Sequence, residues 1–208
     1  MYSNFVIAGL GGSGTKYLAT MLNKSQSWNV RHEGMRDSIK GWDVDHINKC
    51  LENKRNIENF GDVNGFVRCY LDKINCDKKA IILRDTKNIL RGWYDHWQGW
   101  SKDEKTKQYA NHRLYSCFVN TEWTIRKFYQ YISDGMKVIL FKKMISDVDY
   151  LNDIVKWCGI DDLVIKKEEM VKINPHYKKR INYNDIPERD RALWEKITEH
   201  FNQTYIND

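Results

Sequence analysis

The stretch Phe5–Asn23, FVIAGLGGSGTKYLATMLN, holds the information that decides the fold. Its first part, Phe5–Ala8, is a short apolar run, as expected of a strand that is buried on both faces in a parallel sheet. Glycines then cluster in Gly9–Gly14, and the apolar residues that follow return at helical spacing, namely Tyr17, Leu18, Met21 and Leu22. A strand, a glycine-rich turn and a helix in this order predict an α/β domain.

The turn has the composition of a phosphate-binding loop. Backbone N–H groups at the start of a helix point at an anion, and the helix dipole adds favourable potential there. Glycine permits positive φ and lets phosphate oxygens approach the backbone closely. Ser13 and Thr15 can donate hydroxyl hydrogen bonds, and Lys16 supplies a positive charge. The predicted ligand-binding positions are Gly11, Gly12, Ser13, Gly14, Thr15, Lys16 and Tyr17.

Two known kinds of nucleotide-binding loop match this turn in part. A Walker A loop has the spacing of Gly9 and Gly14, but it requires Gly-Lys followed by Ser or Thr, whose hydroxyl binds magnesium. Here Thr15 precedes Lys16 and displaces that hydroxyl, which counts against a P-loop nucleotide kinase. A dinucleotide fingerprint, G-x-G-x-x-G, starts at Gly9 and is followed by an acidic residue nineteen positions after its last glycine. Both alternatives stay open on this segment alone.

The same turn also resembles the loop of sulfotransferases, in Gly12–Leu18, GSGTKYL. In that family the loop holds the 5′-phosphate of the sulfate donor 3′-phosphoadenosine 5′-phosphosulfate (PAPS). Many members carry Lys or Arg directly before the serine, where this chain has Gly12, so the resemblance implies that Lys16 supplies the charge. It further implies a PAPS-dependent enzyme with a P-loop NTPase-like fold.

A second strand is predicted over Ser27–Glu33, and it ends in His32 and Glu33. In an open α/β sheet, ligands bind beyond the carboxyl ends of the strands, so both side chains are expected to face the loop. Either can serve as a general base where burial and charge tune its pKa. Several sulfotransferases carry a catalytic glutamate at this point, often in a His-Glu pair, which favours Glu33 over His32.

A third strand, Ala80–Leu83, ends in Arg84 and Asp85. An arginine at a strand end offers a planar fork of donors that suits phosphate. The segment resembles a second sulfotransferase signature, in which Arg-Asp-Pro is followed by a serine eight residues after the arginine, and both the arginine and the serine bind the 3′-phosphate. Here Arg84 matches, whereas Gly92 stands at the serine position. Gly92 is therefore a predicted donor-site position that lacks its hydroxyl.

The rest of the chain predicts mostly architecture. Helices are expected at about Asp43–Asn53, over the apolar positions from Phe66 to Ile74, and at Tyr109–Tyr131, Asp149–Gly159 and Ile186–Tyr205, and a fourth strand at Lys137–Lys142. The run Lys137–Ile160 resembles a third sulfotransferase block. In that family a carboxyl-terminal loop often reaches the 3′-phosphate, so Lys179 and Arg180 are candidate ligands. Core packing is the default role for the aromatic residues of Trp93–Trp100, and stacking on the donor or on a carbohydrate acceptor is the alternative.

Composition limits the remaining choices. With 208 residues the chain suits one domain over 1–208, and its longest apolar runs are too short to span a membrane or to form a signal peptide before Phe5. Five scattered cysteines indicate reduced thiols in a cytoplasmic protein, with no metal site. The net charge of +6 suits anionic ligands, but acidic residues are interspersed with the basic ones, so no nucleic-acid partner is expected.

The predicted fold is thus α/β, a single three-layer domain with a mostly parallel sheet of about four or five strands and helices on both sides. The predicted function is sulfuryl transfer from PAPS, with Glu33, Lys16 and His32 as catalytic residues. A nucleotide kinase, a dinucleotide-binding protein and a binding module without activity remain as alternatives. The acceptor and the oligomeric state stay open.

Overall fold

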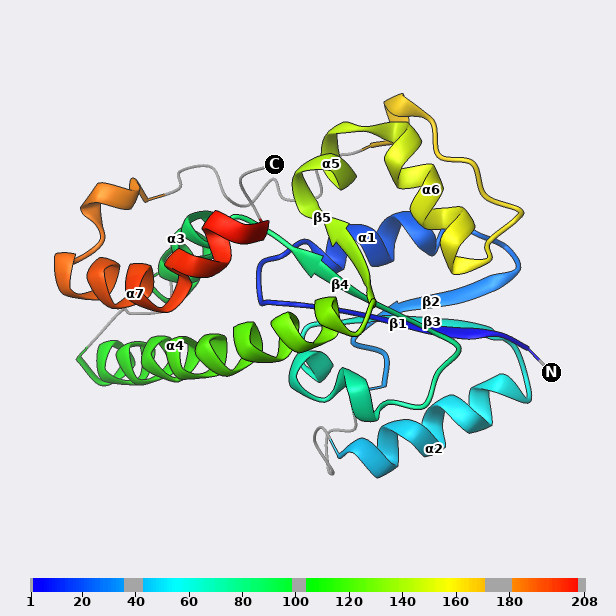
Figure 1. Ribbon diagram of the computed structural model, residues 1–208, viewed down its shortest axis with the longest axis horizontal. Helices are drawn as coiled ribbons and strands as arrows, with labels where there is room; N and C mark the ends of the chain where they lie inside the picture. The colour runs from blue at the N-terminus through cyan, green and yellow to red at the C-terminus, as the bar shows by residue number, and fades with distance from the viewer. Residues whose placement is uncertain (1, 36–42, 99–103, 171–180, 206–208) are drawn as a thin grey trace. The chain divides into compact units, whose positions relative to one another are not determined.

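The computed structural model describes residues 2–35, 43–98, 104–170 and 181–205 (Figure 1). The chain divides into two compact units, one made of Met1–Leu83 with Gln130–Lys172 and the other of Arg84–Tyr129 with Ile173–Asp208. The first unit contains the whole sheet and the glycine loop, and the described part of the second unit is helical. The expected single domain over residues 1–208 stays a prediction.

The sheet of the first unit has five strands, all parallel. They are β1 Asn4–Gly9, β2 Trp28–His32, β3 Asn59–Asn64, β4 Lys78–Leu83 and β5 Lys137–Leu140, in the order β2-β3-β1-β4-β5. Because β1 lies in the centre, between β3 and β4, all six of its residues are buried. The expected α/β fold with a parallel sheet is confirmed.

Helices cover both faces of this sheet (Figure 1). One face packs against α1 Thr15–Leu22, α5 Phe141–Ser146 and α6 Val148–Cys158. Phe5 and Ile7 of β1 point to this side, where they join Leu18 and Leu22 of α1 in the core. The opposite side carries α2 Val44–Arg55, whose Ile47 and Leu51 are buried. All five strands end at the same edge as Gly9, and the glycine loop starts there.

The third strand, β3, was not expected from its sequence, NFGDVN. After it, the apolar positions from Phe66 to Ile74 predict a helix. That helix prediction is wrong, because the segment forms two short 3-10 turns, Val67–Cys69 and Leu71–Lys73. The strand lacks the usual apolar run: Gly61 leaves room for the ring of Phe5, whose Cζ would lie 2.1 Å from an added Cβ.

Other boundaries differ by a few residues. The strand expected at Lys137–Lys142 ends at Leu140, since Phe141 begins α5. The helix α6 ends as expected at Gly159, which has φ 86° and caps the helix. The long helix α4 is Glu104–Ser133 and α7 is Glu188–Tyr205, and short 3-10 turns occur at Lys167–Glu169 and Tyr183–Asp185.

The second unit is built around a tryptophan. Trp194 of α7 is fully buried, and its Nε1–H donates to the carbonyl of Thr86, the first residue of α3 Thr86–Gln98, at 3.1 Å. The rings of Trp93 and Phe118 each lie 5.3 Å from the Trp194 ring. Trp93 therefore packs in a core, as the default interpretation of these aromatic residues held. Among the described residues no helix combines the length and the apolar character that a membrane span needs.

Candidate functional site

The loop between β1 and α1 has the geometry that an anion needs. Gly12 and Gly14 both have left-handed backbones, with φ 82° and 94°, and Gly14 is the residue that precedes the first turn of α1. A Cβ on Gly12 would meet nothing within 4 Å, so this part of the loop is open. A Cβ on Gly14 would lie 2.5 Å from the ring of Phe141. Glycine is therefore required at Gly14 by conformation and by space.

Two hydroxyl groups in this segment are buried without a partner among the described residues. They are Ser13 Oγ and Tyr17 Oη. Ser13 has no exposed surface, and burial raises the pKa of Tyr17. A buried hydroxyl without a hydrogen bond costs about 1–3 kcal/mol, so such groups commonly mark where a ligand or an ordered water binds. Open left-handed glycines and unpaired donors fit the phosphate of a nucleotide donor.

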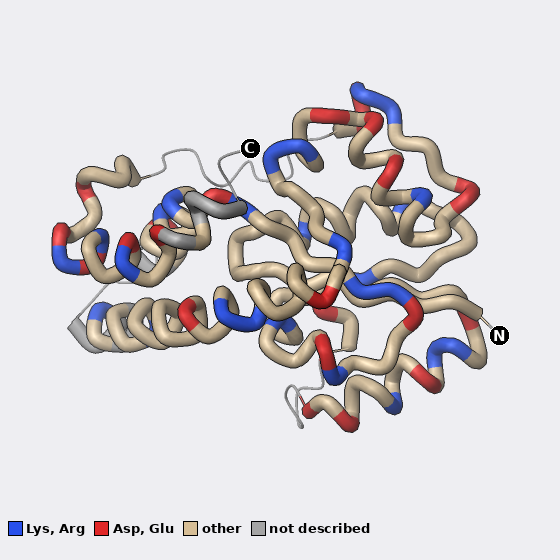
Figure 2. The backbone as a smooth tube through the Cα atoms, viewed as in Figure 1, with Lys and Arg blue, Asp and Glu red and all other residues tan. Residues whose placement is uncertain are grey.

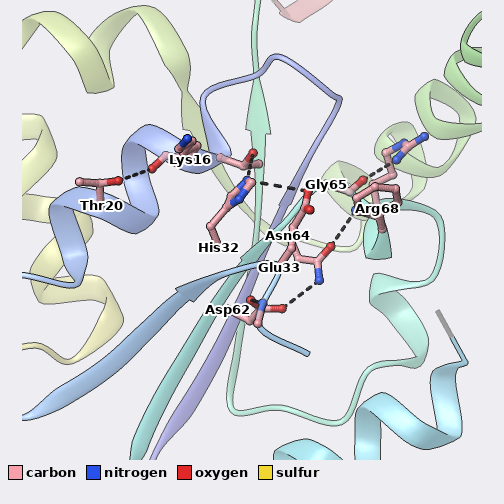
Figure 3. A network of polar contacts seen from close by, with 11 residues as sticks. Lys16, Thr20, His32, Glu33, Asp62, Asn64, Gly65 and Arg68 are labelled. Carbon is pink, nitrogen blue, oxygen red and sulfur yellow. Dashed lines mark hydrogen bonds and ion pairs between the residues drawn. The ribbon is translucent and has the colours of Figure 1, made fainter. Parts of the chain in front are cut away.

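The loop is joined to the end of β2 through Thr15. Its hydroxyl lies 3.1 Å from His32 Nε2, which in turn lies 3.8 Å from Glu33 Oε1. Burial, and next the charge of Lys16, lower the pKa of His32, so the imidazole is neutral at pH 7. The structure thus brings Thr15 together with His32 and Glu33, as the sequence predicted. Figure 3 shows His32 and Glu33 side by side at this point.

Glu33 has a backbone conformation that is unusual for its residue type. Its φ is +57°, and it is the one described residue other than glycine with a positive φ. Such a backbone costs about 1–3 kcal/mol and persists where surrounding contacts hold it. The Glu33 N–H donates to the carbonyl of Val63, and Oε1 lies 3.7 Å from where a Cβ on Gly65 would be. Its carboxylate therefore lies at the carboxyl edge of the sheet, beside the end of β3.

Sequence reasoning missed two residues of this region, Asp62 and Asn64 of β3. Both side chains are fully buried. Asp62 Oδ1 accepts the N–H of Gly34 at 2.8 Å, Oδ2 accepts Asn64 Nδ2–H at 2.9 Å, and the N–H of Met35 is a further donor to this carboxylate. Burial nevertheless raises the pKa of Asp62 to about 6. The sequence could have pointed to them only if β3 had been recognised as a strand, because polar residues inside a central strand are unusual.

Polar contacts continue beyond Asn64 into the following turn. Asn64 Oδ1 accepts the N–H of Phe66 at 2.8 Å, and the guanidinium of Arg68 donates to the carbonyl of Gly65. Figure 3 shows this chain of contacts next to Glu33 and His32, with Lys16 on α1. Lys16 is exposed, as a residue that meets a ligand from solvent should be.

The second unit holds the other predicted donor-site residues. Arg84 directly follows β4 and is half-buried. Asp85 accepts N–H bonds from Lys87, at 2.8 Å, and from Asn88, so it caps α3. The kinase alternative needs an aspartate after a strand, for which Asp85 is the candidate in the sequence, and its capping role counts against that use. A Cβ on Gly92 would meet nothing within 4 Å, and Lys179 and Arg180 lie outside the described residues.

Charge is mixed over the molecule. Figure 2 shows acidic and basic residues alternating along α2, and α6 also carries both signs. Within the described ranges, no cluster of three or more His, Cys, Asp or Glu side chains is placed to hold a metal ion.

Among solved structures, three sulfotransferases are similar to this chain. The sulfotransferase of Alicyclobacillus acidocaldarius is 15% identical with a TM-score of 0.58, over 98% of this chain and 95% of that one. The sulfotransferase domain of the curacin biosynthetic pathway is 9% identical with a TM-score of 0.56, over 97% of this chain and 98% of that one. The sulfotransferase domain of the Synechococcus PCC 7002 olefin synthase is 10% identical with a TM-score of 0.55, over 97% of this chain and 94% of that one.

These similarities establish the fold class. The chain shares the α/β fold of these sulfotransferases, as the three sequence blocks predicted. By sequence, no protein-family model matches the chain, and no curated protein does.

Proposed function

We propose that this chain is a sulfotransferase that moves a sulfuryl group from PAPS to a hydroxyl or amine acceptor. One observation carries the proposal: an open glycine loop with unpaired buried hydroxyls lies next to a His-Glu pair at the carboxyl edge of the sheet. Phosphate-binding donors and a general base in one place are what group transfer from a nucleotide requires.

The roles of the residues follow from their positions. When bound, PAPS supplies the sulfuryl group and a phosphate leaving group. The backbone N–H groups of Gly14 and Thr15, at the start of α1, and the ammonium of Lys16 would hold the 5′-phosphate and stabilise negative charge on it. Glu33 would take the proton of the acceptor at its carboxylate. Neutral His32, joined to Thr15 at 3.1 Å, would fix the loop against the strand end that carries this base.

Recognition of the 3′-phosphate is proposed for basic residues outside the glycine loop. Arg84 is one candidate, and Lys179 and Arg180 are candidates from the carboxyl-terminal segment. Arg91 of α3 is a further basic residue near Arg84 in the sequence, and its Nε–H donates to the carbonyl of Ile181 at 2.8 Å. A carbohydrate acceptor stays a prediction, since the packing of Trp93 on Trp194 favours a structural role for that tryptophan.

A ligand-binding experiment tests the proposal directly. Thermal unfolding would be followed with 3′,5′-adenosine bisphosphate, the product form of the donor, and compared with ATP plus magnesium and with NAD. At a concentration 100 times the Kd, a ligand that binds only the folded state adds about 2.7 kcal/mol of stability, which raises the Tm by several degrees. We expect this increase for the bisphosphate. Preference for ATP-magnesium indicates the kinase alternative, and preference for NAD the dinucleotide alternative.

Two variants connect the binding to the proposed residues. Lys16→Ala removes a charged donor, so the Kd of the bisphosphate should rise about tenfold or more. Arg84→Ala should weaken the bisphosphate more than it weakens adenosine 5′-monophosphate, which has no 3′-phosphate. Lys156→Ala is the matched control, because Lys156 is exposed near the far end of α6, where the carbonyl of Trp157 accepts from Lys78 at the start of β4. Equal effects of Lys16→Ala and Lys156→Ala would contradict the assignment of the loop.

A further inference from the structure

The left-handed turn at Glu33 requires contacts that hold it, and those contacts come from β3. Glu33 directly follows β2, whose register pairs Arg31 with Asp62 and His32 with Val63. Past that point the chain turns, and the N–H groups of the next two residues, Gly34 and Met35, both donate to the Asp62 carboxylate. The backbone on each side of Glu33 is therefore tied to β3.

Asp62 is itself held in place by Asn64. The two residues are two positions apart, so their side chains share one face of β3, and Asn64 Nδ2–H donates to Asp62 Oδ2 at 2.9 Å. The other end of the amide, Asn64 Oδ1, accepts the N–H of Phe66. The amide thereby connects the turn after β2 with the turn after β3, at Gly65, where the Glu33 carboxylate lies.

Burying the carboxylate of Asp62 costs free energy that a residue with only a packing role would not require. Asp62 has no exposed surface, and the cost of burying its charge is visible in a pKa of about 6. An apolar residue at this position in the sheet would avoid the cost but would leave the N–H groups of Gly34 and Met35 without this acceptor. The carboxylate is therefore explained by the turn it holds.

We propose that Asp62 and Asn64 are positioning residues for Glu33: they fix the left-handed turn that aims the Glu33 carboxylate at the glycine loop. The proposal rests on the proposed function, in which Glu33 is the base. It adds two residues to the site that act through the backbone and touch neither donor nor acceptor.

The geometric part can be tested without any assay of activity. At a left-handed position, Glu33→Gly relieves the strain and Glu33→Ala keeps it, so Glu33→Gly should have the larger folding equilibrium constant, by about 5- to 30-fold. The same pair is then made in the Asp62→Asn background and unfolded in urea. If Asp62 imposes the turn, the backbone at position 33 relaxes in the Asp62→Asn background. The logarithm of the ratio between the folding equilibrium constants of the Gly and Ala variants should then fall to less than half its value in the wild-type background. An unchanged difference overturns the proposal.

The kinetic part uses an exchanged pair. Asp62→Asn should lower kcat about tenfold or more, while the Kd of 3′,5′-adenosine bisphosphate changes less than twofold. In the double variant Asp62→Asn/Asn64→Asp, the amide at position 62 can donate to the carboxylate at 64, which can still accept the N–H of Phe66. This variant should recover part of the lost kcat, which a loss of stability alone would not predict.

Asp77→Asn is the matched control. Asp77 Oδ2 accepts the N–H of Asn4 at 2.9 Å, and its other oxygen pairs with Arg55. Asp77 therefore also connects two segments of the chain through a backbone N–H, at the opposite edge of the sheet. Asp77→Asn should lower stability and leave kcat unchanged. Equal losses of kcat in Asp62→Asn and Asp77→Asn would overturn the positioning role. If the urea experiment shows the coupling but the wild type transfers no sulfuryl group, the proposed function fails while the fixed turn at Glu33 stands.

Discussion

The two edges of the parallel sheet use aspartate in opposite ways. At the amino edge, Asp162 is exposed and accepts the hydroxyls of Ser25 and Ser27, each at 2.7 Å, just before β2 begins. These hydrogen bonds hold the pKa of Asp162 well below its ordinary range. At the carboxyl edge, Asp62 is fully buried, and burial raises its pKa to about 6 despite three N–H donors.

The two edges also differ in how much space surrounds their left-handed glycines. Gly159 has φ 86° and ends α6 near the amino edge, where the closest atom to an added Cβ is the flexible end of Lys78 at 3.3 Å. Gly14 has φ 94° at the carboxyl edge, and an added Cβ would meet the ring of Phe141. The amino edge is thus built of tolerant contacts that favour folding. The carboxyl edge keeps costly features, such as strained backbone, unpaired hydroxyls and a buried carboxylate, that binding and chemistry require.

The largest expected effect is on kcat, for a carboxylate substitution at the carboxyl edge compared with one at the amino edge. Glu33→Gln removes the proposed base, so kcat should fall by about 10²- to 10⁴-fold while the affinity for 3′,5′-adenosine bisphosphate is retained. Glu58→Gln makes the same change at the amino edge, where Glu58 accepts from Lys54 and Asn29, and should leave kcat within a factor of two. Initial rates with PAPS, after an acceptor screen, measure both. A similar kcat for Glu33→Gln and the wild type would remove Glu33 from the mechanism.

Glycine substitutions come next. Gly14→Ala combines left-handed strain with a clash against Phe141, so the free energy of unfolding should fall by about 2–4 kcal/mol. Gly159→Ala carries the strain with little steric conflict, and a loss of about 1–2 kcal/mol is expected. Urea unfolding gives both values. Equal losses of unfolding free energy would show that the ring of Phe141 moves to accept the added Cβ. Glycine would then be required at position 14 only because of its left-handed backbone.

The pH dependence of stability should have opposite signs for the two aspartates. The folded-state pKa of Asp62 is raised from 3.8 to about 6, so the folded protein binds more protons than the unfolded chain between these values. Its contribution therefore falls by about 3 kcal/mol as the pH rises from about 4 to 6, and is constant above that. Asp162 has a lowered pKa, so its contribution is lost as the pH falls below about 4.

Stability measured in urea between pH 3 and 8 tests this contrast. Asp62→Asn should flatten the slope between about pH 4 and 6, and Asp162→Asn should leave that part of the curve unchanged. A wild-type slope that survives in Asp62→Asn would mean that another group titrates there.

The smallest expected effect belongs to the exposed carboxylate. Asp162→Asn keeps part of its hydrogen bonding to Ser25 and Ser27, and solvent screens its charge, so stability at pH 7 should fall by about 1 kcal/mol. The control is Asp161→Asn at the neighbouring exposed residue, which should change stability by less than about 0.5 kcal/mol, as is usual for surface sites. A loss of unfolding free energy above about 3 kcal/mol in Asp162→Asn would show that the amino edge tolerates substitution no better than the carboxyl edge.

Local pattern was enough to predict the parts of the fold that carry strong apolar or glycine signals. The run Phe5–Ala8 and the glycines after it define β1 and the loop, because a buried parallel strand is continuously apolar and a phosphate loop needs positive φ. Apolar spacing placed α6, and Gly159 placed its end. The pairing of His32 with Glu33 could be expected because both end a strand at the edge where the loop begins.

Only the tertiary structure decided the role of β3. Its sequence, NFGDVN, has polar and glycine residues where a central strand would have apolar ones, since Gly61 makes room for Phe5 and Asp62 meets donors from a distant turn. Nothing local marks Glu33 as left-handed either, because that backbone is held by hydrogen bonds to Val63 and Asp62. The sequence by itself determined the glycine loop and the strand ends around it. Long-range contacts determined which carboxylate is buried and how the proposed base is held.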